Sequence, residues 1–522
     1  MKERLVEDWL NRINERGYQA AFGQILAGKG YKVLRIGHSP YEHGKDVLAI
    51  SPNGEIHCFQ LKDGDISLKT FENNYAQLIA LVQTRPSHPS LPSDYVYRPF
   101  FVTNGLFKDP ALDRIKRHNI EWQRNGFPEM GTIDGRWLHQ EFTKLSTDFW
   151  PTSPPDIRAL RSLYLVDGRG DFDVATFVRF VRGQFPDDVS QTNLERIAAA
   201  ANIFTSYILG EFYRQSDHWS IFRGWTITAA CISGASERIN CQSEFVKSSF
   251  ELACGAAKEA LAALSAECQT KDAFKPKRLE LDDYTRLRNT VTVGAWAVWC
   301  LMNPDRHEDG EACVSTIKTF INADRLVFWS EGSFAFICSL VWILERHNCI
   351  QEAKKLLFTW LSVVISRQHD RSKDPLPDAY ASPEDVLKDI VEMMLNPEPR
   401  RVKSAQSSCL YSLLMLLVRR GYRKELEETW RQISHVTVTV FQPEEAAGYL
   451  EWNCQRGTER DFTFLQPQSW GELVKMADSP PIEKLPHSLR SDNCFRLMFL
   501  LSFPHRLAWS IIGSLDNEFR RD

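Results

Sequence analysis

The chain has 522 residues, of which 43% are hydrophobic, and its formal net charge at pH 7 is −4. This length is enough for two or three domains with large cores, and the weakly acidic balance excludes a positive field over the whole protein. The 12 cysteines include no Cys-x-x-Cys pair, which indicates buried thiols in a reducing cytoplasm rather than a zinc cluster. The longest apolar runs, 291–302 and 334–344, fall short of the ~20 residues that span a bilayer, so a cytoplasmic protein without a membrane partner is expected.

The first predicted elements are a helix and a strand within residues 18–33, which read YQAAFGQILAGKGYKV. A hairpin is predicted next, because two short apolar runs at 47–50 and 56–61 flank Ser51-Pro52-Asn53-Gly54. Pro, Asn and Gly are turn formers, and such a segment between apolar runs favours two antiparallel strands.

Three polar residues of this hairpin indicate a candidate catalytic site. Side chains alternate along a strand, so Gln60 and Lys62 share a face, and Asp46 begins the partner strand beside them. A carboxylate, an amide oxygen and an ammonium then converge at one end of an apolar hairpin. Such a group can hold a hard divalent cation and position a water molecule against a phosphate.

The elements downstream are a strand at 99–107, a helix at 110–118 and Ile133-Asp134-Gly135 followed by Trp137-Leu138. In this order, with Asp46 and Gln60-x-Lys62 on the hairpin, the chain resembles the PD-(D/E)xK nuclease superfamily. The Gln-x-Lys form is typical of Mrr-type restriction endonucleases. The resemblance covers the chain from residue 1 to about residue 145 and implies an α/β, restriction-endonuclease-like N-terminal domain.

The resemblance also implies an activity, namely metal-dependent cleavage of phosphodiester bonds. Asp46, Gln60 and Lys62 would be the catalytic residues, and Asp46, Gln60 and Leu61 would hold Mg²⁺ or Mn²⁺, with Leu61 contributing its main-chain oxygen. DNA is the expected substrate, and RNA is the alternative. Basic and acidic residues nearly cancel in the first 150 residues, so contact with nucleic acid would depend on a local cluster. The densest cluster consists of Lys108, Arg114, Lys116 and Arg117.

The chain departs from the family pattern at three places. The superfamily usually has a glutamate in the first helix, where this chain has Gln19; Glu15, one turn earlier, could substitute, and Glu42 is a further accessory candidate. Gln60 stands where many members have a carboxylate, which removes one negative charge from the metal site. The connection at 121–132 is also longer than usual.

Residues 150–156 (WPTSPPD) are rich in proline and predict a linker between a domain at 1–149 and a helical region at 157–522. We expect the domain at 1–149 to fold on its own. Loops at 370–386 and 478–486 could divide the helical region further. Helices are predicted where apolar residues recur at three- and four-residue spacing, at 193–213, 243–267, 284–302, 331–346 and 349–367.

The helical region has few other signals. A strand is predicted only at 436–441, and the similarity of 350–364 to 423–433 hints at helix pairs without a fixed period. The pattern is compatible with a helical bundle and with an irregular α-solenoid. The basic clusters Arg400-Arg401-Lys403 and Arg419-Arg420-Arg423-Lys424 could bind phosphate, but helix ends and solvated faces explain them more simply.

Three functions therefore stay open. The first is a metal-dependent endonuclease whose helical region senses a trigger, forms a homo-oligomer or binds a partner, the layout of a bacterial anti-phage or restriction-type defence effector. The second is a catalytically inactive DNA-binding protein, since a nuclease fold can persist without its activity. The third is a scaffold subunit of a defence complex.

Overall fold

The computed structural model describes residues 2–36, 45–88, 90–91, 95–149, 153–169, 172–187, 189–270, 272–275, 282–326, 328–369, 379–381, 386, 406–451, 459–464 and 469–520. The chain forms two compact units, Met1–Ala260 and Leu261–Asp522. An α/β region comes first and a mainly helical region follows, as the sequence predicts.

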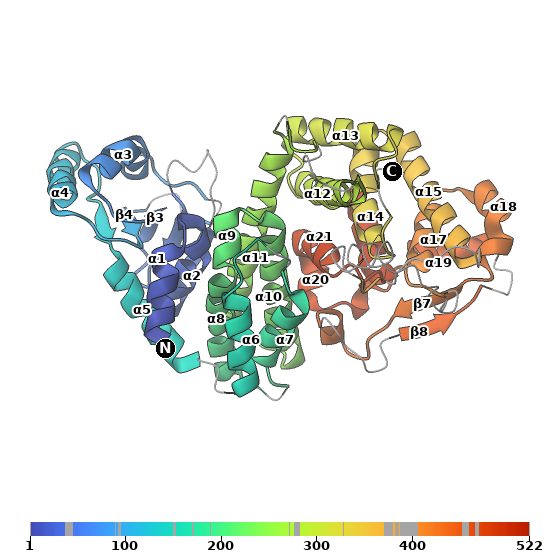
Figure 1. The fold of residues 1–522 in the computed structure, drawn as a ribbon, viewed down its shortest axis with the longest axis horizontal. Helices are drawn as coiled ribbons and strands as arrows, with labels where there is room; N and C mark the ends of the chain where they lie inside the picture. The colour runs from blue at the N-terminus through green and yellow to red at the C-terminus, as the bar shows by residue number, and fades with distance from the viewer. Residues whose placement is uncertain are drawn as a thin grey trace. The chain divides into compact units, whose positions relative to one another are not determined.

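A five-stranded sheet organises the first part of the first unit (Figure 1). Neighbouring strands follow chain order, antiparallel from β1 to β3 and parallel from β3 to β5. Its strands are β1 (Lys32–Ile36), β2 (Val47–Ile50), β3 (Ile56–Lys62), β4 (Tyr97–Thr103) and β5 (Gly131–Ile133). The predicted hairpin is confirmed: Ile50 pairs with Ile56 across a turn in which Gly54 adopts a φ of +84°, a conformation that favours glycine.

Helices cover both faces of this sheet. The described helices of the first unit are α1 (Lys2–Arg12), α2 (Glu15–Gly28), α3 (Leu68–Gln83), α4 (Asp109–Arg124), α5 (Gly135–Phe149), α6 (Pro154–Tyr164), α7 (Val174–Gly183), α8 (Gln191–Ile208), α9 (Gly210–Gln215), α10 (His218–Arg238) and α11 (Glu244–Cys268), which continues into the second unit. On one face, Cys58 and Phe101 pack with Phe71 of α3 and Ile115 of α4. On the other face, Phe22 of α2 contacts the ring of Phe59 and that of Trp137 in α5.

The expected boundary at residue 150 does not separate the compact units, because α1 and α2 pack against the helices that follow. Trp9 donates its indole N–H to the main-chain oxygen of Ser206 at 3.2 Å. Asn202 of α8 donates to Gln24 Oε1 at 2.8 Å, in a fully buried position. Residues 154–156, expected in the linker, form the first turn of α6, because proline fits that turn and Ser153 caps it.

The second unit is mainly helical, as predicted, and also contains a small sheet. Its described helices are α12 (Asp282–Met302), α13 (His307–Asn322), α14 (Ser333–Arg346), α15 (Ile350–His369), α17 (Leu410–Arg419), α18 (Arg423–Ile433), α19 (Trp470–Asp478), α20 (His487–Ser491), α21 (Asn493–Ser502), α22 (Trp509–Phe519) and the 3-10 turns η2 (Ala446–Tyr449) and η3 (Ile482–Lys484). Only the middle strand of the sheet was predicted; the three are β6 (Gln406–Ser407), β7 (Thr437–Phe441) and β8 (Glu459–Phe462).

The two loops expected to divide this region have different outcomes. The loop at 370–386 lies outside the described residues except for 379–381 and 386. The segment 478–486 includes η3, which packs against α22 inside the second compact unit.

One basic cluster of the sequence is half buried. The side chains of Arg419 and Arg420 are 2% and 6% exposed, whereas Arg423 and Lys424 are exposed, as expected. Arg420 makes two contacts with the carboxylate of Glu345, at 2.6 and 2.7 Å, and a third with Asp516 Oδ1 at 2.8 Å. Arg419 reaches Asp516 Oδ2 at 3.2 Å, and Trp342 donates to Asp516 Oδ1 at 2.9 Å. Burial alone would raise the pKa of Asp516, but the two arginines lower it, so these four charged groups cancel within the core. The cluster at 400–403 lies outside the described residues.

Two further expectations concern membrane-spanning helices and cysteines in the described part of the chain. No helix there is long and apolar enough to cross a membrane. None of the cysteines that the structure describes forms a disulfide, and all of them except Cys241 and Cys494 are buried.

Candidate active site

Asp46 and Gln60 meet at the end of the hairpin, as the strand pattern predicts. Val47 pairs with Phe59, and the Asp46 N–H donates to the Phe59 oxygen at 2.8 Å, so Asp46 lies opposite Gln60. Gln60 Nε2 lies 2.6 Å from Asp46 Oδ2, and the Leu61 N–H donates to the same oxygen at 2.6 Å. Asp46 is 4% exposed and Gln60 is 3% exposed, so a charged oxygen and two donors are packed together away from solvent.

The oxygen atoms at this position fit a hard divalent cation. Gln60 Oε1 is buried and accepts no hydrogen bond from the residues that the structure describes. The Leu61 carbonyl accepts a long hydrogen bond, 3.3 Å, from Gln60 Nε2. As placed, Gln60 turns its Nε2 toward Asp46 Oδ2 and the Leu61 carbonyl. A flip of this amide would bring Oε1 to that position, and with the Asp46 carboxylate these atoms would then form an all-oxygen set, which suits Mg²⁺ or Mn²⁺ better than zinc. No group of three His, Cys, Asp or Glu side chains suited to a metal occurs among the described residues, so neutral oxygens would have to complete this set.

Lys62 projects toward the start of α2. Its ammonium lies 2.9 Å from Glu15 Oε2, and the two side chains are 15% and 25% exposed. Partial exposure leaves the ammonium accessible to a substrate, while the carboxylate of Glu15 restrains it. Glu15 and Gln19, the two candidates for the glutamate of the family pattern, both lie on α2. Glu15 is the one that brings a carboxylate to Lys62.

Gln19 has a different role from the one its position in the family pattern suggests. Its Nε2 donates to the main-chain oxygen of Asp46 at 2.7 Å, and the side chain is 3% exposed. A glutamate here would place a carboxylate against a carbonyl oxygen, with no proton to share. The contact explains why an amide is suitable at this position. The third accessory candidate, Glu42, lies outside the described residues.

Tyr18 belongs to the site and was missed by the sequence reasoning. Its hydroxyl donates to the main-chain oxygen of Lys62 at 2.8 Å, and its side chain is fully buried. Burial, and then the negative charges of Asp46 and Glu15, raise the pKa of Tyr18 well above its ordinary value, so the hydroxyl keeps its proton. The available signal was helical spacing, since Glu15, Tyr18 and Gln19 stand at i, i+3 and i+4 on one face.

The chain that leaves the site after Lys62 is fixed by residues at the end of β4. Thr103 Oγ1 donates to the Gly64 oxygen at 2.5 Å, and Asn104 Oδ1 accepts from the Gly64 N–H at 2.7 Å. Asn104 Nδ2 also donates to the carbonyl of Leu10 at 2.7 Å. A Cβ atom on Gly105 would lie 2.3 Å from the carbonyl carbon of Gly64, so this close approach requires glycine.

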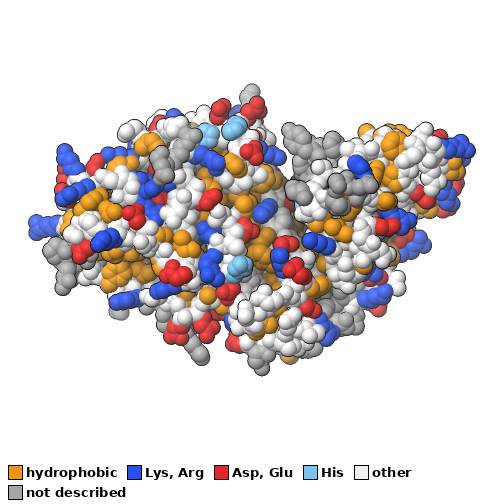
Figure 2. Space-filling model, turned by 180° about the vertical axis from the view of Figure 1, so that it is seen from behind, with side chains coloured by type: hydrophobic (Ala, Val, Ile, Leu, Met, Phe, Trp, Pro, Cys, Tyr) orange, Lys and Arg blue, Asp and Glu red, His pale blue; other side chains and the backbone are white. Residues whose placement is uncertain are grey.

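The basic cluster proposed for nucleic acid is largely neutralised. Lys108 pairs with Asp65 at 2.6 Å, Arg114 with Glu72 at 3.2 Å and Lys116 with Asp113 at 3.9 Å. On the molecular face drawn in Figure 2, Lys and Arg side chains are interspersed with Asp and Glu. A strongly basic binding face is therefore not built by this cluster.

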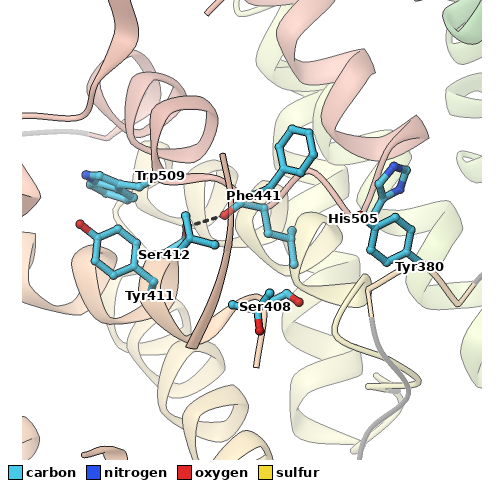
Figure 3. A pocket seen from close by; sticks show the side chains of 10 residues that line it. Tyr380, Ser408, Tyr411, Ser412, Phe441, His505 and Trp509 are labelled. Atoms are coloured by element: carbon cyan, nitrogen blue, oxygen red, sulfur yellow. Dashed lines mark hydrogen bonds between the residues drawn. The ribbon is translucent and has the colours of Figure 1, made fainter. Parts of the chain in front are cut away.

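A small cavity lies in the second unit, between β7, the start of α17 and the segment before α22 (Figure 3). Tyr411, Ser412 and Trp509 lie on one side of it, and Tyr380 and His505 lie on the other. Ser412 Oγ donates to the main-chain oxygen of Leu507 at 2.5 Å. The cavity holds about 10 Å³, room for roughly one water molecule, so it is too small for a nucleotide or a cofactor.

The first unit thus brings the predicted residues Asp46, Gln60, Leu61 and Lys62 to the end of β3, where α2 adds Glu15, Tyr18 and Gln19. These contacts join the two sides of the β2–β3 hairpin to each other and to α2. A comparison with protein-family models, with curated proteins and with solved structures finds no match to this chain.

Proposed function

We propose that the chain is a metal-dependent endonuclease of the PD-(D/E)xK superfamily, in its Mrr-type form, that cleaves phosphodiester bonds of DNA. The single observation that carries the proposal is the buried contact of Asp46 with Gln60 and Leu61, beside Lys62, at the end of β3. The order α2, β1, β2–β3 hairpin, α3, β4, α4, β5 supports it, because it follows the order that the resemblance implies.

A bound Mg²⁺ or Mn²⁺ would polarise the phosphate and lower the pKa of an attacking water molecule. Asp46, Gln60 and the Leu61 carbonyl would hold the cation. Asp46 supplies the full negative charge of this set, and Gln60 a neutral amide oxygen. The buried position of both side chains strengthens their electrostatic interactions relative to water.

Lys62 would act on the scissile phosphate. An ammonium next to the Asp46–Gln60 pair can orient the attacking water and offset the negative charge that develops on the phosphate. Before substrate binds, Glu15 keeps this ammonium in place at 2.9 Å. A phosphate oxygen offers the same kind of acceptor, so Lys62 can pass from one anion to the other without loss of its ionic contact.

The proposed role of the helices rests on the arrangement of the chain, in which a large helical region follows the nuclease-like region. The helices of both units would sense a trigger, form a homo-oligomer or bind a defence protein, as in a cytoplasmic anti-phage or restriction-type effector. One observation favours the alternative of an inactive DNA-binding or scaffold subunit. Gln60 already satisfies Asp46 Oδ2 with a neutral donor, so the pair is stable without a cation.

Cleavage assays distinguish these functions. The purified chain is incubated with supercoiled plasmid, linear DNA and RNA in Mg²⁺, Mn²⁺ or EDTA. We expect nicking or linearisation of DNA with either metal and none in EDTA. Asp46→Asn should abolish it, while the matched change Asp113→Asn, at an exposed position on α4, should not.

The other results have equally definite meanings. Full cleavage in EDTA, or by Asp46→Asn, contradicts the mechanism. Cleavage of RNA but not of DNA identifies RNA as the substrate in place of DNA. Metal-independent DNA binding without turnover favours the inactive alternative.

A further inference from the structure

Lys62 is attached to α2 at two points rather than one. Its ammonium contacts Glu15 at 2.9 Å, and its main-chain oxygen accepts the hydroxyl proton of Tyr18 at 2.8 Å. Glu15 and Tyr18 are one helical turn apart, so a single rigid element holds both ends of the residue. The first contact is partly exposed, whereas Tyr18 is completely buried.

The Lys62 carbonyl occupies a position where the sheet no longer restrains the chain fully. Lys62 is the last residue of β3, and its pairing with Thr103 is the last in the β3–β4 ladder. Two residues later, Gly64 has a φ of +72°, and the chain turns away from the strand direction. The hydroxyl of Tyr18 therefore holds this strand end from the side of α2, while Thr103 and Asn104 hold Gly64 from the end of β4.

We propose that Tyr18 is a positioning residue for Lys62 in phosphodiester cleavage. The inference rests on the proposed nuclease function and adds to it a residue that touches neither metal nor substrate. Tyr18 acts through the main chain, by holding the root of the lysine side chain while Glu15 holds its tip.

The physical consequence is a selective loss of rate. Tyr18→Phe removes one oxygen atom and leaves the aromatic packing of α2 in place. The Lys62 carbonyl then loses its buried donor, and the ammonium can drift from the reacting phosphate. Misplacement of a catalytic group affects the chemical step more than binding. A neutral hydrogen bond contributes about 0.5–1.5 kcal/mol, so we expect kcat to fall about two- to thirteenfold, with KM for DNA nearly unchanged.

The chain offers a matched control in Tyr97. Its hydroxyl also donates to a main-chain oxygen, that of Val82, and it lies on the same sheet at the opposite end of β4. Tyr97→Phe therefore makes the same chemical change away from Lys62. We expect Tyr97→Phe to lower the melting temperature slightly and to keep wild-type kcat, whereas Tyr18→Phe lowers kcat.

A second measurement does not depend on turnover. Brief acylation of the full chain with acetic anhydride, read by mass spectrometry, reports how firmly each lysine is held. We expect Lys62 to react several-fold faster in Tyr18→Phe than in wild type or Tyr97→Phe, and the exposed Lys116 to react equally in all three.

The two proposals fail in different ways. Wild-type kcat together with wild-type Lys62 reactivity in folded Tyr18→Phe overturns the positioning role and leaves the nuclease proposal intact. An equal fall of kcat in both variants also overturns it, because the effect is then one of general stability. A wild-type protein that cleaves none of the substrates overturns the nuclease proposal, and faster acylation of Lys62 in Tyr18→Phe alone would still support the hold of Tyr18 on Lys62.

Discussion

The side-chain amide of Gln60 donates a hydrogen bond of 2.6 Å to the carboxylate of Asp46, the residue that directly precedes β2 of the hairpin. The two residues that would share a cation are thus hydrogen-bonded directly to each other. A neutral donor beside a carboxylate is a stable arrangement, whereas two carboxylates at this distance would repel each other. In the proposed metal site, the identity of residue 60 would therefore set how strongly the site depends on metal.

Gln60→Glu should make folding and activity more dependent on metal. Without metal, the second carboxylate repels Asp46 and destabilises the hairpin; with Mg²⁺, two anionic ligands bind the cation more tightly. We expect the metal concentration for half-maximal cleavage to fall about tenfold, which corresponds to about 1.4 kcal/mol. The rise in melting temperature on adding Mg²⁺ should exceed that of the wild type. Identical metal responses of the two proteins would show that residue 60 is not at the metal.

Lys62→Ala should remove cleavage while the protein still binds DNA. Loss of one preorganised electrostatic contact costs about 3–4 kcal/mol in the transition state, or roughly 10²–10³ in rate. One phosphate contact contributes little to total affinity, so a filter-binding or anisotropy assay should change only slightly. Lys62→Arg should restore little, because a planar guanidinium does not replace a compact ammonium. Lys247→Ala, at an exposed ion pair on α11, is the control. Equal rates for wild type and Lys62→Ala would refute the nuclease proposal.

Gln19→Glu, which introduces the residue usual in the superfamily, should destabilise this chain. The buried amide donates to the Asp46 carbonyl at 2.7 Å, and a carboxylate cannot make that contact. A buried acceptor left without its donor costs about 1–3 kcal/mol, measured as the loss of unfolding free energy in urea. Gln83→Glu, at the exposed end of α3, should change this energy much less. An unchanged stability of Gln19→Glu would mean that the Gln19 contact is dispensable.

A fragment of residues 1–149 should fold less cooperatively than one of residues 1–270. The shorter fragment loses α8, and with it the buried partners of Trp9 and Gln24. An exposed apolar helix face promotes association, so we expect aggregation or a broad melt from the short fragment. The longer fragment contains the first compact unit and should give a single sharp transition. Equal melting temperatures for the two fragments would favour the domain boundary at residue 149.

Stability should fall as pH rises from about 4.5 to about 7, in part through Glu331. Burial raises the pKa of Glu331 to about 7, although it accepts hydrogen bonds from the main chain of Ser408 and Cys409. The folded state then holds a proton that the unfolded state releases at lower pH, so deprotonation opposes folding. The resulting loss of stability is on the order of 3 kcal/mol. It is complete above about pH 7 and absent below about pH 4.5.

Glu331→Gln tests this assignment in urea unfolding experiments across the same pH range. The amide cannot ionise, so the slope of stability against pH should become shallower than in the wild type. Glu428→Gln, at an exposed position on α18, should keep the wild-type slope. A Glu331→Gln protein with an unchanged slope would assign the pH dependence to other groups.

The parts of the fold that the sequence predicts are those governed by local rules. Strand alternation and a Pro-Asn-Gly turn placed Asp46 beside Gln60, and helical spacing located the longer helices. The contacts of Gln19 and Tyr18 join residues 27 and 44 positions apart, and no local pattern encodes them. The small sheet of the second unit was missed because β6 has two residues and β8 is mostly polar. Helix-end rules suggested an exposed arginine pair, but its buried partners lie 75 to 97 residues away.

The buried pair of Arg420 and Asp516 has a consequence for the order of events during synthesis. Asp516 leaves the ribosome 96 residues after Arg420. Until it arrives, Arg420 is paired with Glu345, whereas Arg419 has only a weaker attraction from Asp478 among the described residues, and a buried charge without a close partner is strongly unfavourable. We therefore expect the end of α17 to reach its final packing only when α22 has emerged.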